Sequence, residues 1–118
     1  MVDTPRESPA EAAIVVTLPR EIDLVSAGRV GEDLEAALGQ GVGAVVADMS
    51  GTRFCDTSGV HALVMAHKRA KASHTGFRVV LRPGEVRRVF GILGLDTVLA
   101  IYPRLDLALI ASDPHRPR

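Results

Sequence analysis

The chain has 118 residues, the usual size of one domain, and 47% of them are hydrophobic. Fourteen basic and fourteen acidic side chains give a formal net charge of zero, which argues against direct nucleic-acid binding and against a polybasic membrane anchor. Cys55 is the only cysteine, no apolar run approaches a membrane span, and the first residues lack a signal-peptide core, so we expect a cytoplasmic protein with no membrane association.

Sequence patterns divide the chain into a central domain and two flexible ends. We expect residues 1–12 to be a flexible lead-in and residues 112–118 a flexible tail, because both contain prolines and charges. Residues 13–111 alternate between β-branched runs and helical spacing of apolar residues. The expected elements are a strand over 13–18, an exit loop over 21–23, a helix with its N-cap at Ser26, a strand over 43–48, a loop over 49–57, a helix over 58–73, a strand over 77–81, a helix from Val86 to Leu93 ended by Gly94, a strand over 98–102 and a helix over 105–111.

This alternation predicts an α/β domain. The connections should be right-handed crossovers, which place successive strands parallel to one another. The run Ala44-Val45-Val46-Ala47 is typical of a strand that is buried on both faces. We therefore expect a single-layer, mixed but mostly parallel sheet of four to five strands, with about four helices packed mainly on one side.

Two polar segments follow strands and are the candidates for a functional site. One is Glu21-Ile22-Asp23, after the first strand, and the other is Asp56-Thr57-Ser58-Gly59, after the second. Sites in parallel α/β sheets gather at the carboxyl ends of strands. Adjacent crossovers should bring the two segments close together.

Ser58 has two compatible interpretations. As the N-cap of the following helix, its side chain would accept a hydrogen bond from a backbone N–H two or three residues later. As a phosphorylation site, it would place a phosphate near the free N–H groups and the positive end of the helix dipole. That phosphate would add about 1.5 to 2 negative charges beside Asp56 and close to Asp23.

The order of several segments resembles the STAS domain, and more narrowly the bacterial anti-sigma factor antagonists. Residues 45–50 (VVADMS) and 54–60 (FCDTSGV) resemble the family's apolar strand and its Asp-Ser/Thr-Ser-Gly motif. Residues 21–23 match the last three positions of the family's Gly-Glu-Leu-Asp loop. Residues 86–90 and the pair Gly94-Leu95 resemble its third helix and the Gly-Leu that follows. The resemblance covers about residues 13–111.

The resemblance implies a non-enzymatic switch with Ser58 as the phosphorylated residue and Thr57 as a secondary candidate. The unphosphorylated form would bind an anti-sigma factor that is also a serine kinase and thereby release a sigma factor. A PP2C-type phosphatase would reset the switch, and no cofactor or metal is implied. One departure is Arg20, which stands where the family loop has glycine. The expected partner-binding residues are Glu21, Asp23, Asp56, Thr57, Ser58 and Gly59.

Other classes of function remain as alternatives. The chain could be a STAS subunit of another regulatory or transport complex, or a small nucleotide-binding module, although it lacks a phosphate-cradling glycine loop. Asp56-Thr57-Ser58-Gly59 differs from the aspartic protease motif by one inserted residue. A hydrolase built on Ser58 and His61 lacks the Gly-x-Ser-x-Gly elbow, and the two residues are three apart on one helix. Cys55 is expected to be a buried or half-buried filler.

Overall fold

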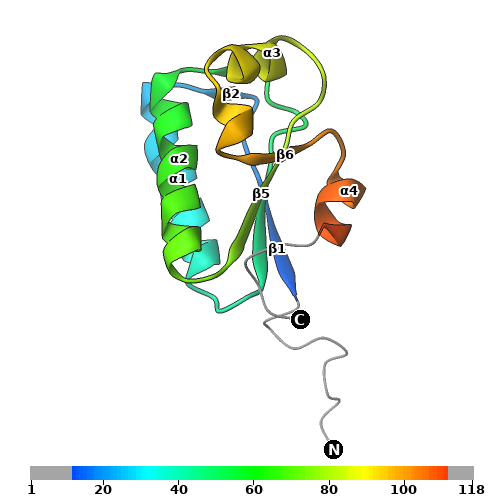
Figure 1. Ribbon diagram of the computed structural model, residues 1–118. Coiled ribbons are helices and arrows are strands. Elements are labelled where there is room, and N and C mark those ends of the chain that lie inside the picture. Colours follow the sequence, from blue (N-terminus) through cyan, green and yellow to red (C-terminus); the bar gives the residue numbers. More distant parts are fainter. Residues whose placement is uncertain (1–11, 112–118) are drawn as a thin grey trace, which may run out of the picture.

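The computed structural model describes residues 12–111 (Figure 1). The flexible ends expected over 1–12 and 112–118 therefore lie outside the described residues, apart from Ala12. A four-stranded sheet forms the centre, in the order β1-β3-β5-β6, and every neighbouring pair is parallel. Its strands are β1 (Ala13–Thr17), β3 (Ala44–Asp48), β5 (Gly76–Val80) and β6 (Ala100–Tyr102).

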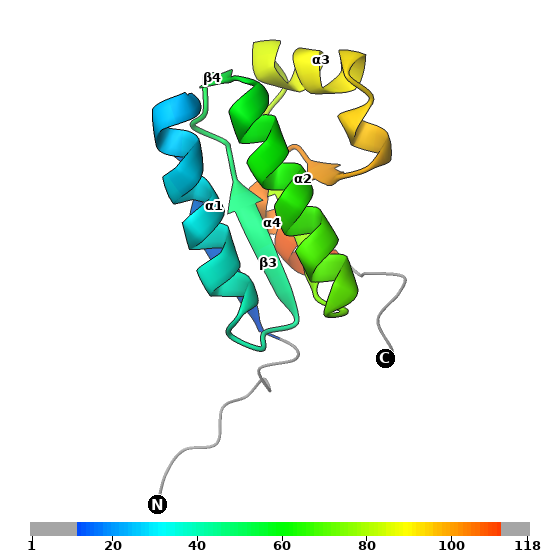
Figure 2. The same cartoon turned by 90° about the vertical axis from the view of Figure 1, so that its left-hand side faces the viewer.

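Helices cover both faces and the top of this sheet. Two long helices, α1 (Leu24–Leu38) and α2 (Thr57–Ala72), lie side by side on one face (Figure 2). The short helix α4 (Leu105–Ile110) lies on the opposite face (Figure 1). Across the top run α3 (Glu85–Ile92) and a 3₁₀ helix, η1 (Leu95–Thr97). The expected α/β class is confirmed, although α4 makes the helical covering two-sided.

Alternation along the strands explains why both faces are covered. Val45 and Val79 are fully buried in the main core beneath α1 and α2. Val46 and Val80 point the other way and are also fully buried, in a smaller cluster with Ala108 of α4. A sheet that is apolar on both faces must be covered on both, so the apolar run over residues 44–47 correctly indicates a doubly buried strand.

Arg78 is an unusual member of the smaller core. It lies on β5 and is only 5% exposed. Its Nη1 donates a hydrogen bond to the carbonyl oxygen of Ala108 at 2.8 Å. Because buried charged groups need such partners, this bond helps to fix α4 against the sheet.

A second, two-stranded parallel sheet appears where loops were expected. Its strands are β2 (Glu21–Ile22) and β4 (Phe54–Cys55). Glu21 pairs with Phe54, and Ile22 pairs with Cys55. The expected loops over 21–23 and 49–57 are thus corrected: each contains a two-residue strand, too short to show the alternation that identifies strands in sequence.

The remaining boundaries differ little from expectation, with one exception. α3 ends at Ile92, one residue earlier than expected, and its C-cap is Leu93 rather than Gly94. Gly94 comes directly after this cap with φ of 76°, the left-handed conformation that commonly stops a helix. β6 begins at Ala100 rather than at residue 98, because residues 95–97 form η1 and the carbonyl of Leu95 accepts from the N–H of Val98 and of Leu99.

Candidate functional site

The N-cap of α1 is Asp23, whereas Ser26 was expected in that role. Its Oδ1 accepts hydrogen bonds from the backbone N–H of Val25 and of Ser26, each at 3.0 Å. The hydroxyl of Ser26 in turn accepts from the N–H of Asp23 at 3.0 Å. These reciprocal bonds form a capping box, so Ser26 serves as the third helical residue rather than the cap.

Asp56 begins α2 in the same way, and this corrects the interpretation of Ser58 as the N-cap. Oδ1 of Asp56 accepts from the N–H of Ser58 at 2.9 Å and from that of Gly59 at 3.3 Å. The Ser58 hydroxyl also donates to this oxygen, at 2.5 Å. Ser58 is therefore the second residue of α2, and its hydroxyl oxygen is not engaged in capping the helix.

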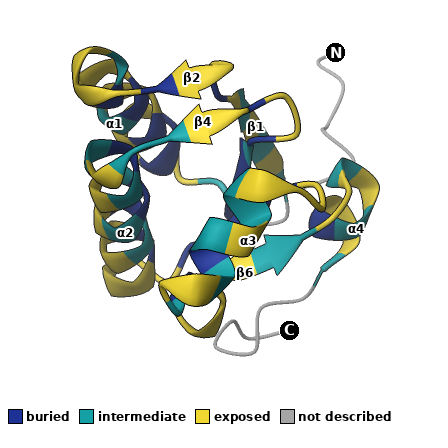
Figure 3. Cartoon of the chain, turned by 90° about the horizontal axis from the view of Figure 1, so that it is seen from above, coloured by how far each residue is buried: buried dark blue, intermediate teal, exposed yellow. Residues whose placement is uncertain are grey.

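The small β2–β4 sheet brings the two candidate segments together. Strand pairing continues beyond it, because the N–H of Asp56 donates to the carbonyl of Ile22 at 3.0 Å. Seen from above, β2 and β4 lie side by side and lead into α1 and α2 (Figure 3). Asp23 and Asp56 are close enough that the charge of Asp23 raises the pKa of Asp56, although other effects outweigh it. The predicted convergence of the two segments is present.

Hydrogen bonds favour the ionised form of both carboxyl groups. The pKa of Asp56 is lowered from its ordinary value, mainly by the hydroxyl of Ser58 and also by the backbone N–H of Gly59 and Ser58. The pKa of Asp23 is lowered mainly by the backbone N–H and hydroxyl of Ser26. With exposed Glu21 nearby, the starts of α1 and α2 form an acidic corner.

Gly59 is buried and has a packing role. A Cβ added at this position would lie 2.6 Å from Sγ of Cys55 and 2.7 Å from Cγ2 of Ile22. Glycine therefore lets the first turn of α2 approach the β2–β4 sheet closely. Burial and the neighbouring charge of Asp56 raise the pKa of Cys55 to about 11, so the thiol is neutral at physiological pH and acts as a half-buried filler.

Three exposed apolar side chains lie next to this corner and were not predicted from the sequence. Leu24 and Val25, in the first turn of α1, are 79% and 89% exposed, and Phe54 of β4 is 51% exposed. Their exposure could have been predicted from their position in the helix, because Leu24 and Val25 lie outside the apolar stripe that contains Val30 and Leu34. We call the acidic residues Glu21, Asp23 and Asp56, the hydroxyl residues Thr57 and Ser58, and the apolar residues Leu24, Val25 and Phe54 together the switch corner.

Arg20 fits its loop without the conformational freedom of glycine. Among the described non-glycine residues only His74 has a positive φ, so the backbone at Arg20 is one that any residue adopts. The carbonyl of Arg20 accepts from the N–H of Arg53 at 2.7 Å and from that of Phe54 at 3.3 Å. These bonds join the loop before β2 to the segment before β4 and help to fix the corner.

Within residues 12–111, no group of three or more His, Cys, Asp or Glu side chains is arranged to hold a metal ion. No helix in the same range is both long and apolar enough to cross a membrane.

Several solved structures resemble this fold, among them three structures of anti-sigma factor antagonists. A crystal structure of an anti-sigma factor antagonist from Mycobacterium paratuberculosis is 33% identical, with a TM-score of 0.76 and 82% of each chain covered. The anti-sigma factor antagonist SpoIIAA in its unphosphorylated form is 20% identical over 87% of this chain and 90% of its own, with a TM-score of 0.69. SpoIIAA from Bacillus in its phosphorylated form is 21% identical over 87% and 93%, with a TM-score of 0.63.

Sequence comparison gives the family. No curated protein sequence matches the chain significantly. The two SpoIIAA structures, at 20% and 21% identity, show likeness of fold, whereas the mycobacterial protein is also a relative in sequence. A family model described as the STAS domain matches residues 5–108, which is most of the chain. The chain therefore belongs to the STAS-domain family.

Proposed function

We propose that the protein is an anti-sigma factor antagonist and that phosphorylation of Ser58 turns it off. The observation that carries this proposal is the Ser58 hydroxyl, half-buried at the start of α2 and hydrogen-bonded to Asp56 within an acidic corner. The mycobacterial relative supports the role, and SpoIIAA has structures in both phosphorylation states. In this proposal the protein acts in the bacterial cytoplasm as a regulator rather than as an enzyme.

The unphosphorylated switch corner offers a partner a mixed surface. Leu24, Val25 and Phe54 supply exposed apolar area, which association would bury. The carboxylates of Asp23 and Asp56 carry negative charge beside it. A complementary partner has an apolar patch rimmed by Lys or Arg side chains. The proposed partner is an anti-sigma factor with serine kinase activity, whose capture releases a sigma factor.

Phosphorylation would act through charge. A phosphate on Ser58 lies within the first turn of α2, where the positive end of the helix dipole favours an anion. It adds about 1.5 to 2 negative charges to a corner that already holds Asp23 and Asp56. The added charge must be desolvated and faces like charges, so docking is lost while the fold is kept. A PP2C-type phosphatase then restores the hydroxyl.

The phosphorylation step is tested by incubating the protein with candidate kinase-type anti-sigma factors and ATP, followed by phosphate mapping by mass spectrometry. Ser58→Ala should abolish incorporation. The matched control Ser73→Ala, at the opposite end of α2 and exposed, should leave it intact. Phosphate that persists in Ser58→Ala, or that no candidate kinase delivers, contradicts the proposed switch.

The binding step is tested with Ser58→Asp and Ser58→Ala against the same anti-sigma factors. Ser58→Ala should bind like the native chain, and Ser58→Asp should bind at least about ten-fold more weakly, which corresponds to about 1.4 kcal/mol. Gln40→Glu adds the same charge at an exposed residue two positions beyond the last residue of α1, and it should not weaken binding. Equal affinities of the Ser58→Asp and Ser58→Ala variants would refute charge repulsion as the mechanism.

A further inference from the structure

A groove runs between α1 and α2, the two helices that lie side by side in Figure 2. Its volume is about 520 Å³, and every residue that lines it belongs to one of these two helices. The apolar part of the lining consists of Ala27, Gly28, Gly31, Ala62, Met65 and Ala66. Because Gly28 and Met65 are exposed, the groove opens to solvent. We call this hollow the interhelical groove.

Gly28 and Gly31 leave the α1 side of the interhelical groove without side chains. Within the described residues, nothing lies within 4 Å of a Cβ added at either position, so packing inside the chain does not require glycine there. Each glycine lowers the stability of the helix by up to about 1 kcal/mol relative to alanine. Exposed helix backbone of this kind allows the backbone of another molecule to approach closely.

Met65 provides the exposed apolar surface on the α2 side. It is 47% exposed, although it lies in the middle of a long helix, and buried Ala27 and Ala66 form the floor beside it. Val25 lies three residues before Gly28, so it extends the apolar surface along α1 to the switch corner. A contiguous exposed apolar surface is typical of a site where another protein binds.

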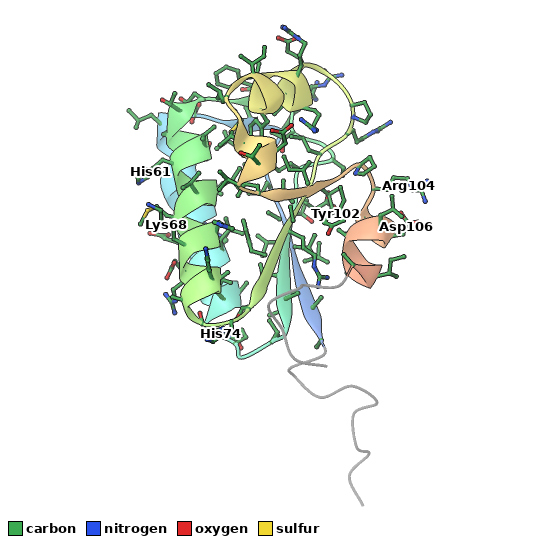
Figure 4. All side chains as sticks on the ribbon, in the orientation of Figure 1. His61, Lys68, His74, Tyr102, Arg104 and Asp106 are labelled. Atoms are coloured by element: carbon green, nitrogen blue, oxygen red, sulfur yellow. The ribbon has the colours of Figure 1, made fainter. Side chains whose placement is uncertain are left out.

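The interhelical groove also carries a free negative charge. Glu32 and Glu35 line it on α1, and Glu35 forms an ion pair with Arg69 of α2. In contrast, Glu32 is exposed and forms no hydrogen bond or ion pair with any residue of the 12–111 range. The remaining polar residue of the lining, His61, lies in the upper part of α2 (Figure 4). The carboxylate of Glu32 is therefore available for a Lys or Arg side chain of a partner.

We propose that the interhelical groove is a docking site for an amphipathic helix of a partner protein, with Lys or Arg beside its apolar face. The lining extends on α1 from Ala27 to Glu35, about 12 Å, which matches about two turns of a helix. Helices bind in such grooves through apolar residues spaced by three and four positions. In this arrangement the partner helix passes over Gly28 and Gly31, its apolar side chains contact Met65, and its cation pairs with Glu32. This surface goes beyond the proposed switch and uses no atom of the phosphorylated residue.

The test is titration of the ¹⁵N-labelled protein with a designed helical peptide of about 15 residues, made of leucine, alanine and lysine so that lysines flank one apolar face. Saturable changes in amide chemical shift should concentrate at Gly28, Gly31, Glu32, Ala62 and Met65. A peptide with glutamate in place of lysine should bind more weakly. Shifts that are absent or concentrated elsewhere, or equal binding of the two peptides, would overturn the proposal. Because the peptide is not a kinase, the result does not depend on the proposed switch.

Variants separate docking in the groove from general attraction between opposite charges. Gly31→Leu fills the groove and should weaken peptide binding about ten-fold. This variant should fold, because the position is open and leucine is a better helix former than glycine. Glu32→Gln should weaken binding about two- to five-fold, the range for an exposed ion pair. The matched control Asp33→Asn removes the same charge from the next residue, which lies outside the groove, and should have no effect. Equal weakening by Glu32→Gln and Asp33→Asn, or unchanged binding by Gly31→Leu, contradicts the proposal.

Analytical ultracentrifugation distinguishes a partner helix from a second copy of this chain as the occupant of the groove. The native chain should remain monomeric at the concentrations of the titration. Self-association that Gly31→Leu abolishes would assign the groove to a second copy and overturn the proposal.

Discussion

Replacing Gly59 with alanine should destabilise the protein, although alanine is the better helix former. The new Cβ would lie 2.6 Å from Sγ of Cys55 and 2.7 Å from Cγ2 of Ile22, both closer than van der Waals contact allows. Cγ2 belongs to a β-branched, fully buried side chain on β2, which cannot rotate away freely. Relief therefore requires α2 and the β2–β4 sheet to move apart.

The magnitude follows from two opposing effects. Overpacking of this kind costs about 1–3 kcal/mol. Exchanging glycine for alanine within a helix gains up to about 1 kcal/mol. The net loss should be about 1–2 kcal/mol in the free energy of unfolding. A change of 1 kcal/mol shifts the melting temperature of a domain of roughly 100 residues by about 4–8 °C, so the effect is readily measured.

Gly28 supplies the matched control, because it lies in α1 with nothing within 4 Å of an added Cβ. Gly28→Ala should raise the free energy of unfolding by up to about 1 kcal/mol, the helix-propensity gain alone. Both variants would be compared by urea unfolding followed by circular dichroism. Adding Cys55→Ala to Gly59→Ala should recover part of the loss, since one of the two clashes is removed. A Gly59→Ala variant as stable as Gly28→Ala would refute the close-packing explanation.

Three further predictions concern titration and burial. Folding lowers the pKa values of Asp23 and Asp56 from 3.8, so the stabilisation that they contribute is present above pH 3.8 and is lost as the pH falls from there through their lower pKa values in the folded protein. Acid unfolding curves of Asp56→Asn should therefore show a weaker pH dependence than those of the native chain. Cys55, with its pKa raised to about 11, should react with iodoacetamide about a hundred-fold more slowly than in the urea-unfolded chain, and equal rates would contradict its burial. Arg78→Leu should lower the free energy of unfolding by about 1–3 kcal/mol, because the buried carbonyl of Ala108 loses its hydrogen-bond donor. Amide hydrogen exchange in α4 should then become faster. Unchanged exchange in α4 would show that this bond does not hold the helix.

Long, periodic segments made the fold predictable. The stripe formed by Val30, Leu34 and Leu38 identifies α1, and the apolar run over residues 44–47 identifies a strand buried on both faces. Once strands and helices alternate, a parallel sheet is close to obligatory, because each crossover returns the chain to the same end. The two-residue strands β2 and β4 could not be predicted, since their pairing depends on tertiary contact between segments more than 30 residues apart.

The N-cap residues were misassigned for a different reason. Ser26 and Ser58 are good capping residues, but an aspartate lies two or three positions before each of them. Residues of either type can cap a helix, so the sequence alone left the starting residue open. The structure shows that both helices begin before the serines. Asp23 and Asp56 have extended backbone conformations, and each carboxylate accepts hydrogen bonds from the backbone N–H groups two and three residues later.

The identity of the cap bears directly on the proposed switch. Had Ser58 capped α2, a phosphate on its oxygen would have replaced the group that starts the helix, and loss of binding could have come from fraying. Because Asp56 is the cap, modification of Ser58 removes one hydroxyl donor and leaves the acceptor of two backbone N–H groups in place. The helix start and the proposed switch therefore use different atoms. This separation is what allows added charge to change binding at the switch corner without requiring the fold to change.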